Sequence, residues 1–357
     1  MAGYIVKKLG YALLTLWGVV TVIFLLFTLL PGDPARMMLG QNENAEQLAI
    51  VKKKYGFDQP ISKQYLYYLN DLSPISFHST VAEDYTFLTQ GKYSSTQLFD
   101  IGTTTVVLKT PYLRESFQKN GKPVSQVIAE TLPNTFVLAV SAIIIAIILG
   151  ILLGIVSVLH KDKWLDKTIQ LVSTFGMSVP SFFSAIIFAW LFGFVLHKYT
   201  HLNMTGSLYE VDDFGAGSYI QLKNLILPSI VLGIRPLAVV SQLMRNSLLE
   251  VLNQDYIRTA KAKGLSRYTI IRKHALKNAL NPVVTAVSGW FASMLAGAVF
   301  VEYIFGWNGL GKEIVDALNT LDLPIIMGAV LIIATLFILI NIFVDIIYGW
   351  LDPKIST

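Results

Sequence analysis

Two short stretches of the sequence have residue types and spacings that could support binding chemistry. Residues Gly306 to Lys312 (GWNGLGK) have the spacing of a phosphate-binding loop. In such a loop a Ser or Thr follows the lysine and holds magnesium, but Glu313 stands there, and no strand is predicted before the loop. We therefore expect no nucleotide to bind here. No catalytic or metal-binding constellation is predicted either, since the 357 residues include no cysteine and His274 has no acidic or His neighbour at ligand spacing.

Arg235 is the second candidate, because it lies within an apolar stretch and precedes Pro236. Arg235 lies about ten residues after the start of that stretch (about residues 225–244), which is about 15 Å along a helix. A charge at the bilayer midplane costs at least about 2.5 kcal/mol and normally faces a partner or a water-filled cavity. Arg235 would then line a translocation path and attract a carboxylate. Alternatively it forms a structural ion pair, or the stretch starts elsewhere and Arg235 lies near an interface. Pro236 predicts a disturbance of the helix.

A basic segment, Leu249 to Pro282, is the most informative part of the chain. Residues 255–263 favour a helix, Gly264 suits a helix end or sharp turn, and residues 267–280 favour a second helix. Small residues such as Ala260 would let another protein approach closely, and the basic residues would supply complementary charge. The alternative is an interfacial helix held to anionic lipid by its Lys and Arg residues.

The surrounding elements are predicted to be membrane-spanning helices. Hydrophobic residues make up 54% of the chain and charged residues 14%, where a soluble domain carries about 25% charge. A transmembrane helix needs roughly 20 mostly apolar residues. Six stretches qualify: about residues 9–30, 135–159, 169–196, 225–244, 283–305 and 324–351. Glu302, near the end of the fifth stretch, is expected to be solvated at the membrane interface, and Gly150 and Gly154 are expected to allow close helix packing.

Lys and Arg residues predict which loops are cytoplasmic. They concentrate at the N-terminus, after the second stretch and after the fourth, whereas the alternate loops carry mainly acidic residues. The charges of all the short loops agree with a topology of six spans and both termini in the cytoplasm. The net charge of +5 is therefore a topology signal, and no nucleic-acid partner is expected. The first stretch is too long for a signal-peptide core and is expected to be a retained anchor.

The predicted organisation has four parts. Residues 1–30 form the first helix, residues 31–122 an extracytoplasmic segment, residues 123–351 a core of five helices with the basic loop (residues 245–281), and residues 352–357 a cytoplasmic tail. The stretch from Tyr93 to Thr110 favours strands. The outside segment is expected to be a packing cap, with a ligand-binding domain as the alternative.

Several motifs give the chain a recognisable pattern. Within the basic loop, Asp255-Tyr256, Thr259-Ala260, Ala262-Lys263-Gly264-Leu265, His274-Ala275 and Asn278-Ala279 resemble the cytoplasmic loop of permeases from binding-protein-dependent ABC importers, in their dipeptide/oligopeptide/nickel branch. Leu30 to Pro34, Tyr55 to Pro60, Thr131 to Thr135 and Glu302 to Gly311 are also similar to motifs of this branch. Arg258 and Thr259 replace the Glu-Ala of the general importer pattern, as in the peptide branch. The segment of about residues 73–121 is longer than in the branch, so its role is not implied.

This resemblance implies an all-α integral membrane protein with the type I importer permease fold and a mixed extracytoplasmic insert. It implies one half of a path for peptides or similar solutes across the bacterial inner membrane. The implied partners are a second, different permease chain, two ATPase subunits, an extracytoplasmic solute-binding protein and membrane lipid. The chain itself would bind no cofactor and would not be an enzyme, because ATP and magnesium belong to the ATPases. The residues expected to contact an ATPase are Asp255, Tyr256, Thr259, Ala260, Lys263, Gly264, Leu265, His274 and Asn278.

The alternative function is a self-contained secondary transporter or channel. That class more often has ionisable residues in several spans and a two-fold internal repeat, and neither is evident here. Within the importer interpretation, the sequence leaves the solute open among dipeptides, longer peptides, nickel chelates and glycans.

Overall fold

The computed structural model describes residues 2–29, 35–36, 44–82, 84–89, 93–212 and 217–351. The predicted tail (352–357) and the motif from Leu30 to Pro34 therefore lie outside the described residues. The chain divides into two compact units, one of Met1–Glu130 with Ile314–Thr335 and one of Thr131–Glu313 with Leu336–Thr357. We call them unit 1 and unit 2 and describe each by itself.

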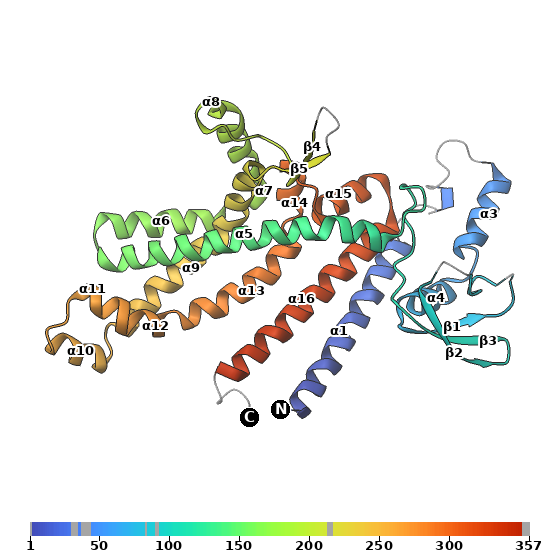
Figure 1. Ribbon diagram of the computed structural model, residues 1–357, viewed down its shortest axis with the longest axis horizontal. Helices are drawn as coiled ribbons and strands as arrows, with labels where there is room; N and C mark the ends of the chain where they lie inside the picture. The colour runs from blue at the N-terminus through green and yellow to red at the C-terminus, as the bar shows by residue number, and fades with distance from the viewer. Residues whose placement is uncertain are drawn as a thin grey trace. The chain divides into compact units, whose positions relative to one another are not determined.

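Unit 1 combines helices with a small antiparallel sheet (Figure 1). Its complete elements are α1 (Ala2–Leu29), α3 (Ala45–Tyr55), α4 (Ile61–Leu72), β1 (Ile75–Ser79), β2 (Ser95–Ile101) and β3 (Thr104–Lys109). The strand order is β1-β3-β2, so β3 is central. The prediction of strands between Tyr93 and Thr110 is confirmed.

Aromatic packing joins α1 to α4 within unit 1. The ring of Phe24 lies against those of Tyr65 and Tyr68, with centroids 5.2 and 5.9 Å apart. The hydroxyls of Thr21 and Tyr65 form a hydrogen bond of 2.6 Å. Leu331 completes this buried cluster. Aromatic burial of this kind contributes both area and ring contacts to stability.

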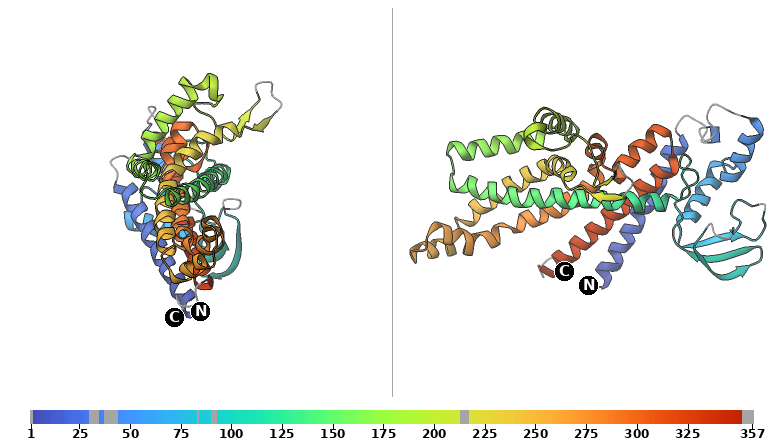
Figure 2. Two further views of the ribbon diagram at one scale, coloured as in Figure 1. Left: turned by 90° about the vertical axis from the view of Figure 1, so that its left-hand side faces the viewer. Right: turned by 45° about the horizontal axis from the view of Figure 1, so that its top comes forward.

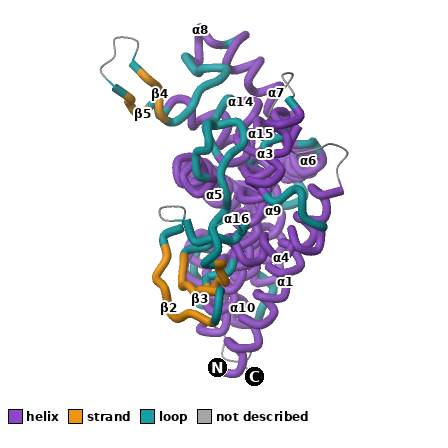
Figure 3. Tube along the Cα trace, turned by 90° about the vertical axis from the view of Figure 1, so that its right-hand side faces the viewer, coloured by secondary structure: helices purple, strands orange, loops and turns teal. Residues whose placement is uncertain are grey.

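Unit 2 is almost entirely helical. Its elements are α6 (Trp164–Ser178), α7 (Ser181–Phe188), the π-helix η1 (Ala189–Val195), α8 (His197–Thr200), β4 (Tyr209–Val211), β5 (Ser218–Ile220), α9 (Lys223–Val251), α10 (Asp255–Ala262), α11 (Arg267–Thr269), the π-helix η2 (Ile270–Ala275), α12 (Leu276–Ala279), α13 (Asn281–Gly297) and α14 (Val299–Phe305). Three helices belong partly to each unit: α5 (Val124–Leu159), α15 (Leu310–Thr320) and α16 (Leu323–Leu351). Within unit 2, α8 with β4 and β5 lies at one end and α10 at the other (Figure 1, Figure 2 and Figure 3).

Two glycines bring α5 and α9 into close contact, as predicted. A Cβ added at Gly150 would lie 2.7 Å from Val240 Cγ1, and one at Gly154 would lie 2.6 Å from Met244 Cβ. Both distances are below a van der Waals contact, so only glycine fits at these positions. The small pair on α5 therefore determines how near α9 can pack.

Several of the predicted membrane helices are present, and one predicted span is sharply bent. Among the described residues, four helices are long and apolar enough to cross a membrane, and up to six segments qualify if each bent pair is one span. The third predicted span bends by 107° between Ser178 and Ser181, and a 50° bend between Ala279 and Asn281 lies just before the fifth predicted span. Pro180 lies within the first break and Pro282 directly after the second, and proline cannot continue the hydrogen bonding of a preceding helix. The expectation of one uninterrupted helix was therefore wrong for the third span, and the fifth predicted span is divided into α13 and α14.

Candidate functional site

The basic loop forms a short helix, a glycine turn and a second helical run at one end of unit 2 (Figure 1). Helix α10 covers Asp255–Ala262 and is followed by Gly264 at φ 75°, a left-handed conformation that glycine adopts without strain. Ser266 then caps α11, since its side chain accepts a hydrogen bond from the amide of Thr269. The helix–glycine–helix predicted from the sequence is confirmed, with η2 continuing the second run.

The inner face of the loop is part of the hydrophobic core. Ile257 is fully buried and Ala260 is 6% exposed. They belong to a cluster that also includes Val158, Val240, Met244, Leu248, Ile270, Ile271, Ala275, Ala279 and Val283. These residues come from α5, α9, η2, α12 and α13, so α10 packs near the ends of three long helices, α5, α9 and α13. The buried face of α10 is therefore in direct packing contact with those helices.

Two polar contacts fix the loop further. Arg267 Nη2 donates to the carbonyl oxygen of Val158 at 3.1 Å, which ties the loop to the last turn of α5. Asn278 Nδ2 donates to the hydroxyl of Tyr256 at 2.8 Å, which joins α12 to α10. Because these bonds link separate elements, they restrict movement of α10 relative to the helices behind it.

A buried ion pair lies next to the loop. Arg245, near the end of α9, donates to both oxygens of Asp166 at the start of α6, with distances of 2.8 Å from Nε and Nη2. The amide of Asp162 donates to the same carboxylate at 3.0 Å, and Ser157 of α5 also donates to it. Sequence reasoning treated Arg245 only as a topology charge and missed Asp166. No local signal marks a pair 79 residues apart.

The outer face of the loop is open to solvent. Tyr256 is 43% exposed, Leu265 37% and Tyr268 69%. The predicted contact residues Asp255, Thr259, Lys263, Gly264, His274 and Asn278 are exposed as well. Ala260 differs, since its side chain packs into the chain's own core and offers no surface to a partner. Tyr268, which was not predicted, adds an aromatic side chain to this face. The arrangement combines exposed apolar and basic groups, which suits a protein partner.

Arg235 lies away from the basic loop, within α9. Its side chain is exposed, and it makes no hydrogen bond or ion pair with any residue that the structure describes. The structural ion pair considered above is therefore not formed within the described chain. Pro236 does not interrupt the helix, because α9 runs continuously from Lys223 to Val251. The predicted disturbance stays a prediction, since Pro236 has no amide hydrogen to donate within this continuous helix.

Glu302 is the clearest departure from expectation. It is fully buried instead of solvated, and its Oε2 accepts the amides of Gly311 and Lys312 at 2.7 and 3.1 Å. A Cβ at Gly309 would lie 2.4 Å from Glu302 Cδ. The carboxylate therefore occupies the space inside the glycine loop where a phosphate would sit in a nucleotide-binding protein. Its volume opposes phosphate binding there.

The glycine loop is also held from α5. Trp307 Nε1 donates to the carbonyl of Asn134 at 3.0 Å, Asn134 Nδ2 donates to the carbonyl of Asn308 at 2.7 Å, and the amide of Leu310 donates to Thr135 Oγ1 at 2.8 Å. Thus two sequence motifs that are far apart in the chain form one structural joint. Among the described residues, no group of three His, Cys, Asp or Glu side chains could hold a metal ion.

Comparisons with known proteins agree with this architecture. The family described as binding-protein-dependent transport system inner membrane component matches residues 146–357, and the N-terminal model of such membrane components matches residues 1–77. The chain is 33% identical to the dipeptide transport system permease protein DppB of Alkalihalophilus pseudofirmus over the whole of both chains. It is 32% identical to the di/tripeptide transport system permease protein DppB of Pseudomonas aeruginosa, over 99% of each chain.

Another relative is the glutathione transport system permease protein GsiC of Salmonella typhi, 33% identical over 99% of each chain. Among solved structures, a chain of the inward-facing MetNI methionine ABC transporter matches with a TM-score of 0.50 and 16% identity. The match covers 64% of this chain and 97% of that one, and it supports the permease fold.

Proposed function

Because the chain belongs to the family of binding-protein-dependent transport system inner membrane components, we propose that it forms half of an inward path for short peptides. The family is one of transport permeases of ABC importers, not of enzymes. Its members lie in the inner membrane and work with ATPase subunits and a solute-binding protein. The self-contained transporter considered above has no support from these relatives.

The single observation that carries the proposal is the basic loop. A short helix that is buried on one face and exposed on the other rests on the ends of α5, α9 and α13. Such a helix can receive a push from an ATPase and pass it to the helices behind it, which is how a rigid element couples two sites. The exposed residues Tyr256, Leu265 and Tyr268 supply the contact surface for the ATPase.

The solute class follows from the relatives, which are named for dipeptides, di- and tripeptides and glutathione. These solutes all carry a free carboxylate. Arg235 is an exposed cation within a predicted span, so it is suited to attract that carboxylate along the path. A second, different permease chain would supply the other half of the path.

The topology proposed for this function has both termini in the cytoplasm. Basic residues then lie in the cytoplasmic loops, in agreement with the positive-inside rule. Two ATPase subunits would bind ATP and magnesium, and this chain would bind neither. The loop occupied by Glu302 fits that division, since its glycines surround a carboxylate.

Uptake by the reconstituted transporter tests the proposal. The chain is placed in proteoliposomes with its partner permease, the ATPases and the binding protein, and uptake of radiolabelled tri-alanine is measured. ATP-dependent accumulation that is lost with Gly264→Trp supports the proposal, because Trp cannot adopt the left-handed turn without strain. Uptake that requires an ion gradient and not ATP would overturn it.

A further inference from the structure

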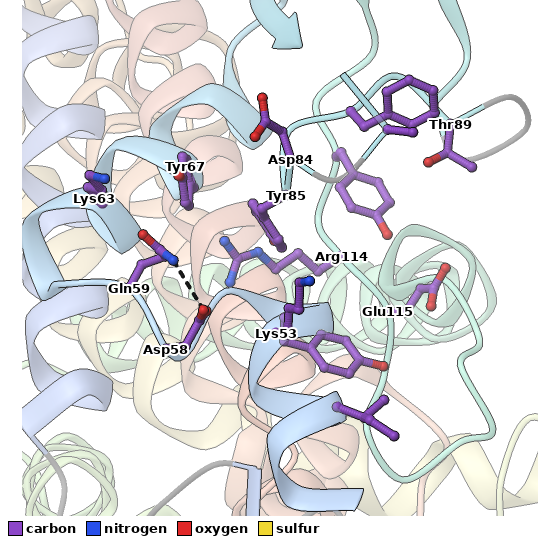
Figure 4. A pocket seen from close by; sticks show the side chains of 15 residues that line it. Lys53, Asp58, Gln59, Lys63, Tyr67, Asp84, Tyr85, Thr89, Arg114 and Glu115 are labelled. Carbon is purple, nitrogen blue, oxygen red and sulfur yellow. Dashed lines mark hydrogen bonds between the residues drawn. The ribbon is translucent and has the colours of Figure 1, made fainter. Parts of the chain in front are cut away.

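A polar cavity lies within unit 1, in the part of the chain whose role the sequence left open. Its volume is about 800 Å³, which is in the range of sites for small ligands. Figure 4 shows residues of α3, α4 and the segments before and after the strands lining it. All the lining residues belong to unit 1, so the cavity is complete within one compact unit.

Arg114 is the central cation of this cavity. Its Nε donates to Asp71 Oδ2 at 2.9 Å, and its guanidinium carbon lies 5.3 Å from the centre of the Tyr68 ring. Neither Nη1 nor Nη2 makes a hydrogen bond with any described residue, and 20% of the side chain remains exposed. In Figure 4 the guanidinium extends into the cavity between Tyr85 and Lys53. Two parallel N–H donors are thus left for a ligand.

The backbone at Arg114 is held in an unusual conformation. Its φ is 67°, in the left-handed region that non-glycine residues seldom occupy. The following loop is fixed, because Asp322 accepts the amides of Phe117 and Gln118 at 3.1 Å each. Asp71 is fixed too, since its carbonyl accepts the amide of Tyr112 at 2.8 Å. Strain that the surroundings maintain is typical of binding sites.

The remaining walls suit a ligand with charges at both ends. Lys53 and Lys63 add positive charge, and Asp58, Asp84 and Glu115 add negative charge. Figure 4 shows Glu115 on the far side of Arg114 from Asp58 and Gln59. A zwitterion could therefore place its carboxylate at Arg114 and its ammonium near one of the acidic side chains.

Aromatic side chains form the apolar part of the walls. Tyr67 and Tyr85 pack with ring centroids 5.0 Å apart and ring planes tilted by 32°, and Phe87 also lines the cavity. A Cβ at Gly56 would lie 3.3 Å from Tyr85, so the glycine turn allows this ring to settle against the backbone. Burial raises the pKa of Tyr85 to about 12, so its phenol stays neutral at physiological pH. Such surfaces accept the apolar side chains of peptides of varied sequence.

We propose that this cavity is a second peptide site, in which Arg114 Nη1 and Nη2 bind the C-terminal carboxylate of a short peptide. The choice of ligand rests on the proposed function, but the cavity lies in unit 1, whereas Arg235, the residue proposed to attract solute along the path, lies in unit 2. Guanidinium binds carboxylate with two parallel hydrogen bonds, which lysine cannot reproduce. The cavity would hold peptide on the permease itself, independently of the solute-binding protein.

The test measures binding of tri-alanine to the purified full-length chain in nanodiscs, without the solute-binding protein. Its C-terminal amide serves as the matched ligand, because it lacks the carboxylate. We expect tri-alanine to bind and the amide to bind at least about tenfold more weakly. Arg114→Lys should weaken tri-alanine binding by about tenfold while keeping a positive charge beside Asp71. Lys198→Gln, which removes an exposed positive charge in unit 2, should leave binding unchanged.

Equal binding of acid and amide would overturn the proposal without any question of misfolding. Failure of the purified chain to bind tri-alanine, while the complete transporter takes it up, would also overturn the site and leave the proposed function intact. Tri-alanine binding that is unchanged by Arg114→Lys would likewise overturn the proposal, because the guanidinium would then not hold the carboxylate.

Discussion

Arg245 and Asp166 form a two-point ion pair in which both guanidinium–carboxylate distances are 2.8 Å. The exposed fractions of the two side chains are 19% and 4%. Since Ser157 of α5 donates to the same carboxylate, the pair joins α5, α6 and α9 at one point. Arg245 lies shortly before α10 in the chain, so this joint helps to make the support of the basic loop rigid.

Breaking this pair should destabilise the protein. Arg245→Gln leaves a buried carboxylate without its charged partner, which typically costs about 3 kcal/mol or more. We expect a lower unfolding temperature in detergent, measured by differential scanning fluorimetry. Arg258→Gln is the control, because Arg258 and Asp255 pair while 75% and 94% exposed, and its effect should be near zero. Equal effects of the two substitutions would contradict this account of the joint.

The two faces of the basic loop should respond differently to substitution. Tyr268→Ala removes an exposed side chain, so we expect normal stability but about tenfold weaker association with the ATPase, as for a contact residue at an interface. Ile257→Asp places a charge in the core and should destabilise the loop itself. Thermal unfolding and ATPase pull-down, measured on the same samples, separate these effects. An unchanged ATPase association in Tyr268→Ala would exclude that residue from the contact.

The glycine loop around Glu302 should not tolerate even one extra methyl group. Gly309→Ala would bring a Cβ to 2.4 Å from Glu302 Cδ, and we expect a loss of about 1–3 kcal/mol from overpacking. Gly289→Ala on α13 is the matched control, because no atom lies within 4 Å of its added Cβ. Thermal unfolding of both variants checks the difference. If Gly309→Ala is as stable as Gly289→Ala, the carboxylate does not fill the loop.

Close packing of α5 on α9 gives a similar prediction. The Cβ of Gly154→Ala would lie 2.6 Å from Met244 Cβ and 2.9 Å from the Ser241 carbonyl oxygen, so the helices must separate. We expect about 1–3 kcal/mol of destabilisation and reduced uptake. Gly18→Ala on α1, where an added Cβ meets nothing within 4 Å, should be neutral in thermal unfolding. Full uptake and stability in Gly154→Ala would show that the helices do not pack this closely.

Local features were predictable from the sequence. The helix at Asp255–Ala262 and the turn at Gly264 follow from helix-forming residues and one glycine, and β2 and β3 follow from a segment rich in Thr and Val, whereas β1 was not predicted. Hydropathy located the spans but not the 107° bend before Ser181, because both arms of that bend are apolar. A hydropathy window averages the residue types and does not report a change in the direction of the helix axis.

Contacts between distant residues were not predictable in this way. Glu302 was expected to be solvated because it lies near the end of a predicted span. Its burial depends on Gly309 and Gly311, which leave room for its carboxylate only when the loop is folded. Asp166 gave no signal because its partner is 79 residues away. The cavity around Arg114 is another such case, since α3, α4 and the segments flanking the sheet all contribute to it.

Cross-linking from the basic loop tests the central claim most directly. The chain has no cysteine, so Tyr268→Cys creates a single attachment point for a benzophenone maleimide. The control is Tyr199→Cys on α8, whose side chain is 78% exposed at the other end of unit 2. The account predicts a light-dependent adduct with the ATPase subunit from position 268 and none from position 199. An adduct from position 199 alone, or none from position 268 in an active transporter, would contradict it.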